Sequence, residues 1–180
     1  MACIRNFYKI FLILLVFFYS NLGLATPSKM FAGYFGRFGS VITDDVSNAV
    51  SEGSILAINY SMALMEKENF PVEGGIFSSI IFGQEGKSKF DLVPRLTWSA
   101  RGEEFAPFIF TLGLGMGFTF LFLQTNNYGG FVGHFIVGTD VIIADGIAIG
   151  GESIIEIPLS NKEENPFNIS VLIRVTHRWG

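Results

Sequence analysis

The chain has 180 residues, of which 12 are basic and 16 acidic, so its formal net charge is −4 at pH 7. This balance argues against nucleic acid as a partner, because nucleic-acid binding requires a face rich in lysine and arginine. Phenylalanine and glycine are unusually frequent, at 20 and 21 residues. A chain this apolar must bury its large side chains in a core or turn them towards lipid. The single cysteine, Cys3, lies within the first 25 residues, so we expect no disulfide and no thiolate metal site in the rest of the chain.

The first 25 residues have the pattern of a secretory signal peptide. Arg5 and Lys9 form a basic start, an apolar run follows from Ile10 to Tyr19, and Gly23-Leu24-Ala25 offers the small residues of a cleavage site. The run of about ten residues is too short for a membrane-spanning helix, which needs about 20. We therefore expect cleavage after residue 25 and a single mature domain over residues 26–180.

Eight segments of the mature sequence alternate apolar and polar side chains with the period of a β-strand. In chain order they are Met30–Gly39, Ser54–Leu64, Val72–Phe82, Phe90–Ser99, Pro107–Leu123, Phe131–Ile143, Ile147–Ile157 and Phe167–Trp179. The clearest is Pro107–Leu123, whose even positions are all large and apolar while its odd positions are mostly glycine and threonine. The first segment has phenylalanines on both faces around Arg37, which leaves its orientation open. Pro94 interrupts the fourth segment, and we expect a bulge or distortion there.

The connections alternate in length, as in an up-and-down barrel. With the N-terminus on the periplasmic side, the outer loops are Val41–Gly53, Gly83–Ser88, Gln124–Gly130 and Leu159–Pro166. The inner turns are Glu66–Pro71, Ala100–Glu104 and Ala144-Asp145-Gly146. An even number of strands returns both termini to the same side, and the inner turns are the shorter ones, as transmembrane barrels require.

Side-chain size indicates which face of the strands is outside. Eight strands enclose a bore only wide enough for side chains to fill. The polar face carries mostly glycine, alanine, serine and threonine, which suit a narrow interior, whereas the apolar face is too bulky to converge on one axis. A soluble lipocalin-like barrel would reverse the two faces, but its Gly-x-Trp start motif is absent. The sequence therefore predicts an all-β, eight-stranded antiparallel transmembrane barrel with a lipid-facing apolar surface.

The charges within the strands lie on the polar face, so we expect them in the lumen. Pairing the last two strands symmetrically about their loop puts Glu152 opposite Arg174, and counting across the preceding turn puts His134 opposite Glu156. Buried charges without partners are costly, so we predict a structural salt-bridge cluster of Arg95, Glu152 and Arg174 and a further pair of His134 and Glu156. The alternative is that some of these charges are solvated near a barrel mouth.

The sequence from Phe105 to Gly117, an aromatic-proline-aromatic start followed by Gly113-x-Gly115-x-Gly117, resembles a strand of the small outer-membrane barrels of the OmpA and OmpX type. The run Gly133–Glu156 resembles the following hairpin of that family. The terminal strand is similar to its assembly signal, although Gly180 follows the closing aromatic Trp179. The resemblance implies a protein of the bacterial outer membrane, surrounded by lipid and inserted by the barrel-assembly machinery through its C-terminal strand. It identifies an architecture and not an activity.

The sequence assigns no catalytic, cofactor-binding or metal-binding residue. Gly113-x-Gly115-x-Gly117 lacks the spacing of a nucleotide-binding loop, and no group of histidine, aspartate and glutamate has the spacing of metal ligands along the chain. A PagL-type lipid A deacylase on this scaffold would need a His-x-Ser pair and a carboxylate. His134 is followed by Phe135-Ile136-Val137 and His177 by Arg178, so that pair is missing.

The expected function is therefore non-enzymatic. The barrel would support the outer membrane or present its extracellular loops to an unknown ligand, chiefly through Val41–Gly53 and Gln124–Gly130. An outer-membrane enzyme acting on lipid and a narrow channel for small solutes remain the alternatives.

Overall fold

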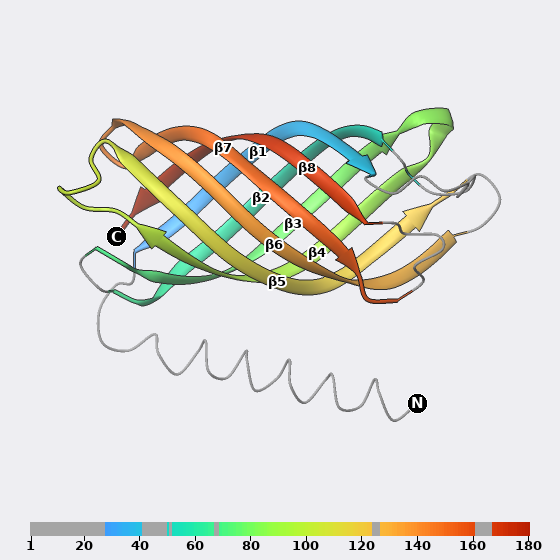
Figure 1. Cartoon of the computed structure of the whole chain (residues 1–180), viewed down its shortest axis with the longest axis horizontal. Coiled ribbons are helices and arrows are strands. Elements are labelled where there is room, and N and C mark those ends of the chain that lie inside the picture. The colour runs from blue at the N-terminus through green and yellow to red at the C-terminus, as the bar shows by residue number, and fades with distance from the viewer. Residues whose placement is uncertain (1–27, 41–49, 51, 67–68, 124–126, 161–166) are drawn as a thin grey trace, which may run out of the picture.

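A computed structural model describes residues 28–40, 50, 52–66, 69–123, 127–160 and 167–180. Their strands form one closed antiparallel barrel, in which each strand pairs with its neighbours in sequence and the last pairs with the first (Figure 1). The predicted eight-stranded all-β barrel is confirmed. The expected signal peptide, residues 1–25, lies outside the described residues, as do the greater part of the predicted loop Val41–Gly53 and parts of Glu66–Pro71, Gln124–Gly130 and Leu159–Pro166.

The strand bounds follow the predicted segments closely. They are β1 (Lys29–Ser40), β2 (Glu52–Met65), β3 (Val72–Gly83), β4 (Ser88–Ala100), β5 (Phe108–Phe122), β6 (Asn127–Ala144), β7 (Ile147–Pro158) and β8 (Asn168–Trp179), with a short 3-10 helix, η1 (Gln84–Gly86), between β3 and β4. β6 begins before the predicted strand, because the backbone of residues 127–130 pairs with β5 although two glycines interrupt the apolar pattern. No helix in the described ranges has the length and apolarity of a membrane-spanning helix.

The two ends of the barrel differ in their connections. We name the end where β1 begins and β8 ends, and where the β2–β3, β4–β5 and β6–β7 connections lie, the turn end, and the opposite end the loop end (left and right in Figure 1). The β6–β7 turn is the tightest, with two residues between the strands, and Gly146 adopts a φ of +70° there. Glycine reaches this left-handed conformation without steric cost.

The outer surface of the barrel is an apolar belt. Large apolar side chains of every strand point outward and are between 37 and 63 % exposed. Along β5 these are Phe108, Phe110, Leu112, Leu114, Met116, Phe120 and Phe122. Within the described strands the exposed charged side chains, Arg37 and Glu52, lie near the loop end. Such a surface suits hydrocarbon, where a closed barrel also satisfies every backbone hydrogen bond internally.

The structure settles the orientation of β1, which the sequence left open. Tyr34 and Phe38 are buried in the lumen, whereas Phe35 and Arg37 are exposed on the outside. Phe38 belongs to an apolar group near the loop end that also contains Val50. Hydrophobic side chains therefore occupy part of the lumen near the loop end.

Of the bulge or distortion expected at Pro94, the structure shows a distortion without a bulge. The β4–β5 register is the same on both sides of it, with Leu92 opposite Phe118 and Arg95 opposite Gly115, although the pairs of Val93 and Pro94 are missing. On its other side Pro94 pairs regularly with β3. Pro94 therefore interrupts the pairing with β5, but β4 has no extra residue there and the register is kept. The register shifts in the described strands lie near the turn end instead, in β2 and β6.

Candidate functional site

Polar side chains fill the middle of the lumen, and we name Tyr34, Arg95, Asp140, Glu152 and Arg174 the central group. Arg95 Nη1 donates to Glu152 Oε1 at 2.8 Å, and Arg174 Nη1 donates to the other oxygen of the same carboxylate. Arg174 also donates from Nε and Nη2 to the two oxygens of Asp140, at 2.9 and 2.8 Å. Such two-pronged contacts are among the strongest hydrogen bonds in proteins. Two arginines and two carboxylates balance the charge of the group.

The central group brings together Arg95, Glu152 and Arg174, the three residues that the sequence predicted to form a cluster. The register differs from the one expected, because Arg174 lies opposite Gly150 and Glu152 opposite Leu172. The two charges meet diagonally, since the long arginine side chain spans the offset of two residues. The expected pairing of Glu152 with Arg174 rests on a loop centred between β7 and β8, and the observed register is shifted by two residues from it.

Sequence reasoning missed two members of the central group. Asp140 lies on β6 at the same inward parity as His134, so the alternation of that strand could have placed it in the lumen. Tyr34 lies on β1, whose orientation was ambiguous, and its hydroxyl donates to Glu152 Oε2 at 3.4 Å. Arg95 also stacks on the ring of Phe77, with its guanidinium carbon 3.3 Å from the ring centroid.

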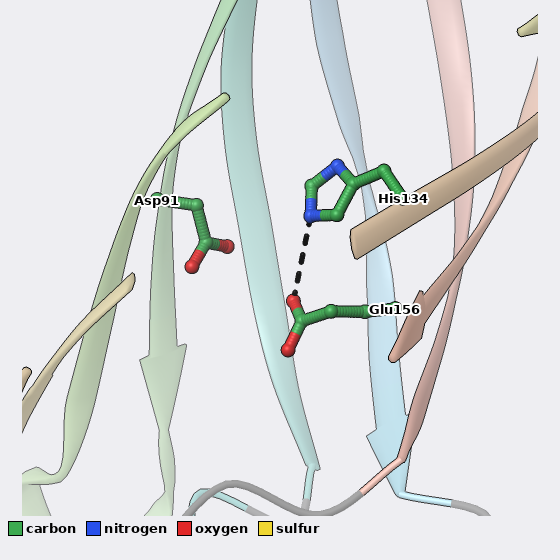
Figure 2. A group of neighbouring side chains, drawn as sticks. All are labelled: Asp91, His134 and Glu156. Atoms are coloured by element: carbon green, nitrogen blue, oxygen red, sulfur yellow. Dashed lines mark ion pairs between the residues drawn. The ribbon is translucent and has the colours of Figure 1, made fainter. Parts of the chain in front are cut away.

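A second set of charges, Lys89, Asp91, His134 and Glu156, lies nearer the loop end, and we name it the loop-end group. His134 lies directly opposite Glu156 in the β6–β7 ladder, as the sequence count expected. His134 Nε2 is 3.7 Å from Glu156 Oε2 (Figure 2). The Lys89 ammonium contacts Glu156 and is 3.7 Å from Asp91 Oδ1. All four side chains are buried.

The histidine and the two carboxylates of the loop-end group form a potential metal-ligand cluster. One ligand atom from each of Asp91, His134 and Glu156 lies within 4.8 Å of the others. The spacing of these residues along the sequence does not reveal the cluster, because its members come from β4, β6 and β7. They become neighbours only when the barrel closes.

A third set of charges lies at the turn end. Glu73 is buried, contacts Arg178 and lies 3.9 Å from Arg101. Outside the strands, Glu66 Oε1 accepts a hydrogen bond from the backbone amide of Ser28 at 2.9 Å. This hydrogen bond holds the pKa of the Glu66 carboxyl below its ordinary value. The start of β1 is thereby tied to the end of β2.

The described part of the lumen contains a cavity of about 10 Å³ between the central group and the turn-end charges. This volume is room for about one water molecule. Asn59 Oδ1, Ser99 Oγ and Arg95 Nε border the cavity and are buried without a hydrogen-bond partner in the protein. Residues with these properties commonly hold an ordered water.

Among the described residues, neither histidine forms a Ser–His pair that faces lipid. His134 is enclosed in the lumen, where Arg95 Nη2 donates to its Nδ1 at 3.3 Å. His177 is on the outer face, between Phe31 and Ile147 of the paired strands, and its ring lies 5.3 Å from that of Trp179. A serine hydrolase that cleaves an acyl chain of a membrane lipid needs its histidine beside a serine at the lipid surface.

A closed antiparallel barrel of eight strands, with an apolar belt outside and an ion-paired lumen, is the architecture of the small β-barrels of the bacterial outer membrane. No protein-family model matches the chain, and no curated protein matches it. Solved structures do. Neisserial surface protein A is similar with a TM-score of 0.60 at 5 % identity, over 84 % of this chain and 97 % of that one.

Two further structures show the same fold. The N-terminal barrel domain of Pseudomonas aeruginosa OprF matches with a TM-score of 0.60 at 7 % identity, over 84 % of this chain and 97 % of that one. The outer-membrane enzyme PagL matches with a TM-score of 0.51 at 13 % identity, over 83 % of this chain and 98 % of that one. At these identities the likeness shows the fold alone, and one of the three proteins is an enzyme.

Proposed function

We propose that the protein is a non-enzymatic, non-conducting barrel of the bacterial outer membrane that presents its loop end to partners outside the cell. The observation that carries the proposal is the central group, which blocks the bore with paired charges and leaves a cavity of about 10 Å³. With the bore filled, and with neither histidine hydrogen-bonded to a serine in the part of the chain that the structure describes, the support is strongest for contact through the loops.

Planar-bilayer recording tests whether the lumen conducts. The wild-type protein should give no stable conductance steps, because a hydrated ion cannot pass the paired Arg95, Glu152 and Arg174. Arg95→Ala removes the side chain that links the central group to His134, so rare openings should appear in this variant. Steady conductance of the wild type would refute the filled bore and favour the channel.

Lipid analysis tests the enzymatic alternative. PagL has the same fold, so a lipid A deacylase is the enzyme to exclude. Mass spectra of lipid A from cells with and without the gene should show the same acyl pattern. Loss of an acyl chain in the expressing cells, abolished by His177→Gln, would assign catalysis to the outer face and overturn the non-enzymatic proposal.

The route to the membrane is a separate part of the proposal. We propose that residues 1–25 are removed on export and that the barrel-assembly machinery recognises β8, which ends in Trp179. The mature protein should start at Thr26 by N-terminal sequencing and should change its gel mobility on boiling. Trp179→Ala should lower the amount assembled in the outer membrane, whereas Val175→Ala on the same face of β8 should not. A chain that keeps residues 1–25 in the membrane would refute cleavage.

Surface display of the loop end can be tested with one epitope at two sites. An epitope inserted in the predicted loop at residue 45 should be labelled by antibody on intact cells. The same epitope between Asp145 and Gly146, in the β6–β7 turn, should be labelled only after the outer membrane is opened. The reverse pattern would show that the turn end faces outward and would remove the basis of the proposed loop contacts.

A further inference from the structure

Three potential metal ligands meet inside the barrel near the loop end, and each comes from a different strand. Asp91 lies on β4, His134 on β6 and Glu156 on β7, and their side chains converge in the lumen (Figure 2). We propose that these three side chains bind one divalent transition-metal ion of the zinc class. The site is independent of the proposed function, because a filled and non-conducting barrel is equally possible with or without a metal.

The environment of the two carboxylates supports the proposal. Ser79 Oγ donates to Asp91 Oδ2 at 3.0 Å, and Asn168 Nδ2 donates to Glu156 Oε1 at 3.2 Å. Each carboxylate therefore has one oxygen held by a neighbouring donor, which is how metal-binding carboxylates are usually oriented.

Two buried polar atoms point into the space between these side chains. Asp91 Oδ1 and His134 Nε2 have no hydrogen bond and only ion-pair contacts at 3.7 Å, with Lys89 and Glu156, although their residues are 2 and 4 % exposed. A buried polar atom without a hydrogen bond costs about 1–3 kcal/mol, so two in one small space call for a ligand. A cation fits both, since one is a carboxylate oxygen and the other an imidazole nitrogen.

The spacing of the donors is compatible with a metal after a small movement. Atoms 4.8 Å apart at most lie no more than about 2.8 Å from a common centre, and zinc is bound by nitrogen and oxygen at about 2.0–2.2 Å. Side-chain movements of less than about 1 Å bring the three donor atoms to zinc-bonding distance. One imidazole and two carboxylates favour zinc and its neighbours over calcium or magnesium, which prefer oxygen ligands alone.

Lys89 competes with the metal for the same carboxylates. Its ammonium contacts Glu156 and is 3.7 Å from Asp91 Oδ1. Lys89, Asp91 and Glu156 together carry one excess negative charge, and a divalent ion changes this to one excess positive charge. Without the ammonium, the two negative charges of Asp91 and Glu156 are balanced by the two positive charges of one divalent ion. Lys89→Met should therefore bind the metal more tightly than the wild type.

Metal binding also changes which ring nitrogen of His134 carries the proton. Arg95 can only donate, so its contact with Nδ1 places the proton of a neutral imidazole on Nε2. A metal at Nε2 takes the place of that proton, and Nδ1 takes up one proton to keep the ring neutral. Arg95 then gives up its contact with His134 and keeps its ion pair with Glu152. The bound ion would tie β4 to β6 and β7 across the lumen.

The test measures zinc in protein purified from outer membranes, from cells grown with added zinc and with a purification tag that lacks histidine. Loading during growth is used because all three ligands are buried. Mass spectrometry should find about one zinc per chain in the wild type and in Lys89→Met. His134→Gln and Glu156→Gln should hold at least tenfold less. His177→Gln is the matched control, because the same substitution on the outer-face histidine should leave zinc unchanged.

Gel mobility before and after boiling shows whether each variant is folded. Zinc absent from the folded wild type, or equal in wild type and folded His134→Gln, would overturn the proposal. If the lumenal variants do not fold, X-ray absorption of the zinc-loaded wild type decides. A shell of nitrogen and oxygen with the scattering of one imidazole supports the site, and a shell without imidazole overturns it.

Discussion

Replacing Glu152 with glutamine removes the carboxylate that both lumenal arginines of the central group share. Arg174 keeps its two contacts with Asp140, but Arg95 loses its ion pair and is left as a buried charge. Breaking a buried pair by removing one partner costs about 3–5 kcal/mol. Because the glutamine oxygen can still accept one hydrogen bond, we expect a loss of about 3 kcal/mol, or roughly 150-fold in the unfolding equilibrium.

Urea unfolding in lipid vesicles measures this loss. Both tryptophans, Trp98 and Trp179, lie in the outer belt, so their fluorescence reports the transfer of the strands from lipid to water. Ser153→Ala is the control, because Ser153 follows Glu152 on β7 but faces outward. It should unfold at the same urea concentration as the wild type.

A double variant distinguishes a charge effect from a packing effect. Glu152→Gln combined with Arg95→Met restores the balance of charge, with Arg174 and Asp140 still paired. Replacing a buried ion pair with groups of similar volume is often neutral or stabilising, so the double variant should regain most of the lost stability. If Glu152→Gln unfolds within about 1 kcal/mol of the wild type, or if the double variant is the sum of the two single ones, the central group is not a coupled network.

The lipid-facing belt predicts that the cost of a charge depends on depth. Leu114→Arg, in the middle of β5, should cost about 2–4 kcal/mol in vesicles, whereas Phe110→Arg near the turn end should cost about 0–1 kcal/mol; equal unfolding midpoints would contradict a membrane centred on the strands. The close approach of β1 and β8 predicts a difference between two glycines. A Cβ at Gly36 would lie 2.1 Å from Val171 O, whereas one at Gly33 has open space, so Gly36→Ala should lose about 1–3 kcal/mol and Gly33→Ala should unfold like the wild type.

The strand positions were predictable because the side chains of a transmembrane strand alternate between large apolar ones that face lipid and small or polar ones that face the lumen. β5 is the clearest case, since every even position carries a large apolar side chain on the outer face, whereas the odd positions are mostly glycine and threonine and face the lumen. β1 was ambiguous for the same reason, because Phe35 and Phe38 lie on opposite faces of one strand. Pattern alone could not decide that Phe38 fills the lumen under the Lys89 ammonium, 5.1 Å from its ring centroid.

The candidate site was predictable only where neighbouring strands were involved. His134 and Glu156 could be paired by counting across a two-residue turn, and the structure has them opposite each other. Counting across the longer β7–β8 loop misplaced Arg174 by two residues. Asp91 could not be joined to His134 by counting at all, because β5 lies between their strands and their contact depends on the curvature of the closed barrel.

The glycines of the inner wall make space for the arginines. A Cβ at Gly115 would lie 3.1 Å from Arg95 Cγ, and one at Gly138 would lie 3.1 Å from Arg174 Nη2. Each long cation thus lies against a stretch of the neighbouring wall that has no side chain, so the missing Cβ atoms make room for the arginine. A lengthened side chain on one strand can be offset by a shortened one on another. One barrel shape can therefore enclose different sets of lumenal side chains, and the three solved barrels of the same fold share only 5–13 % of their residues with this chain.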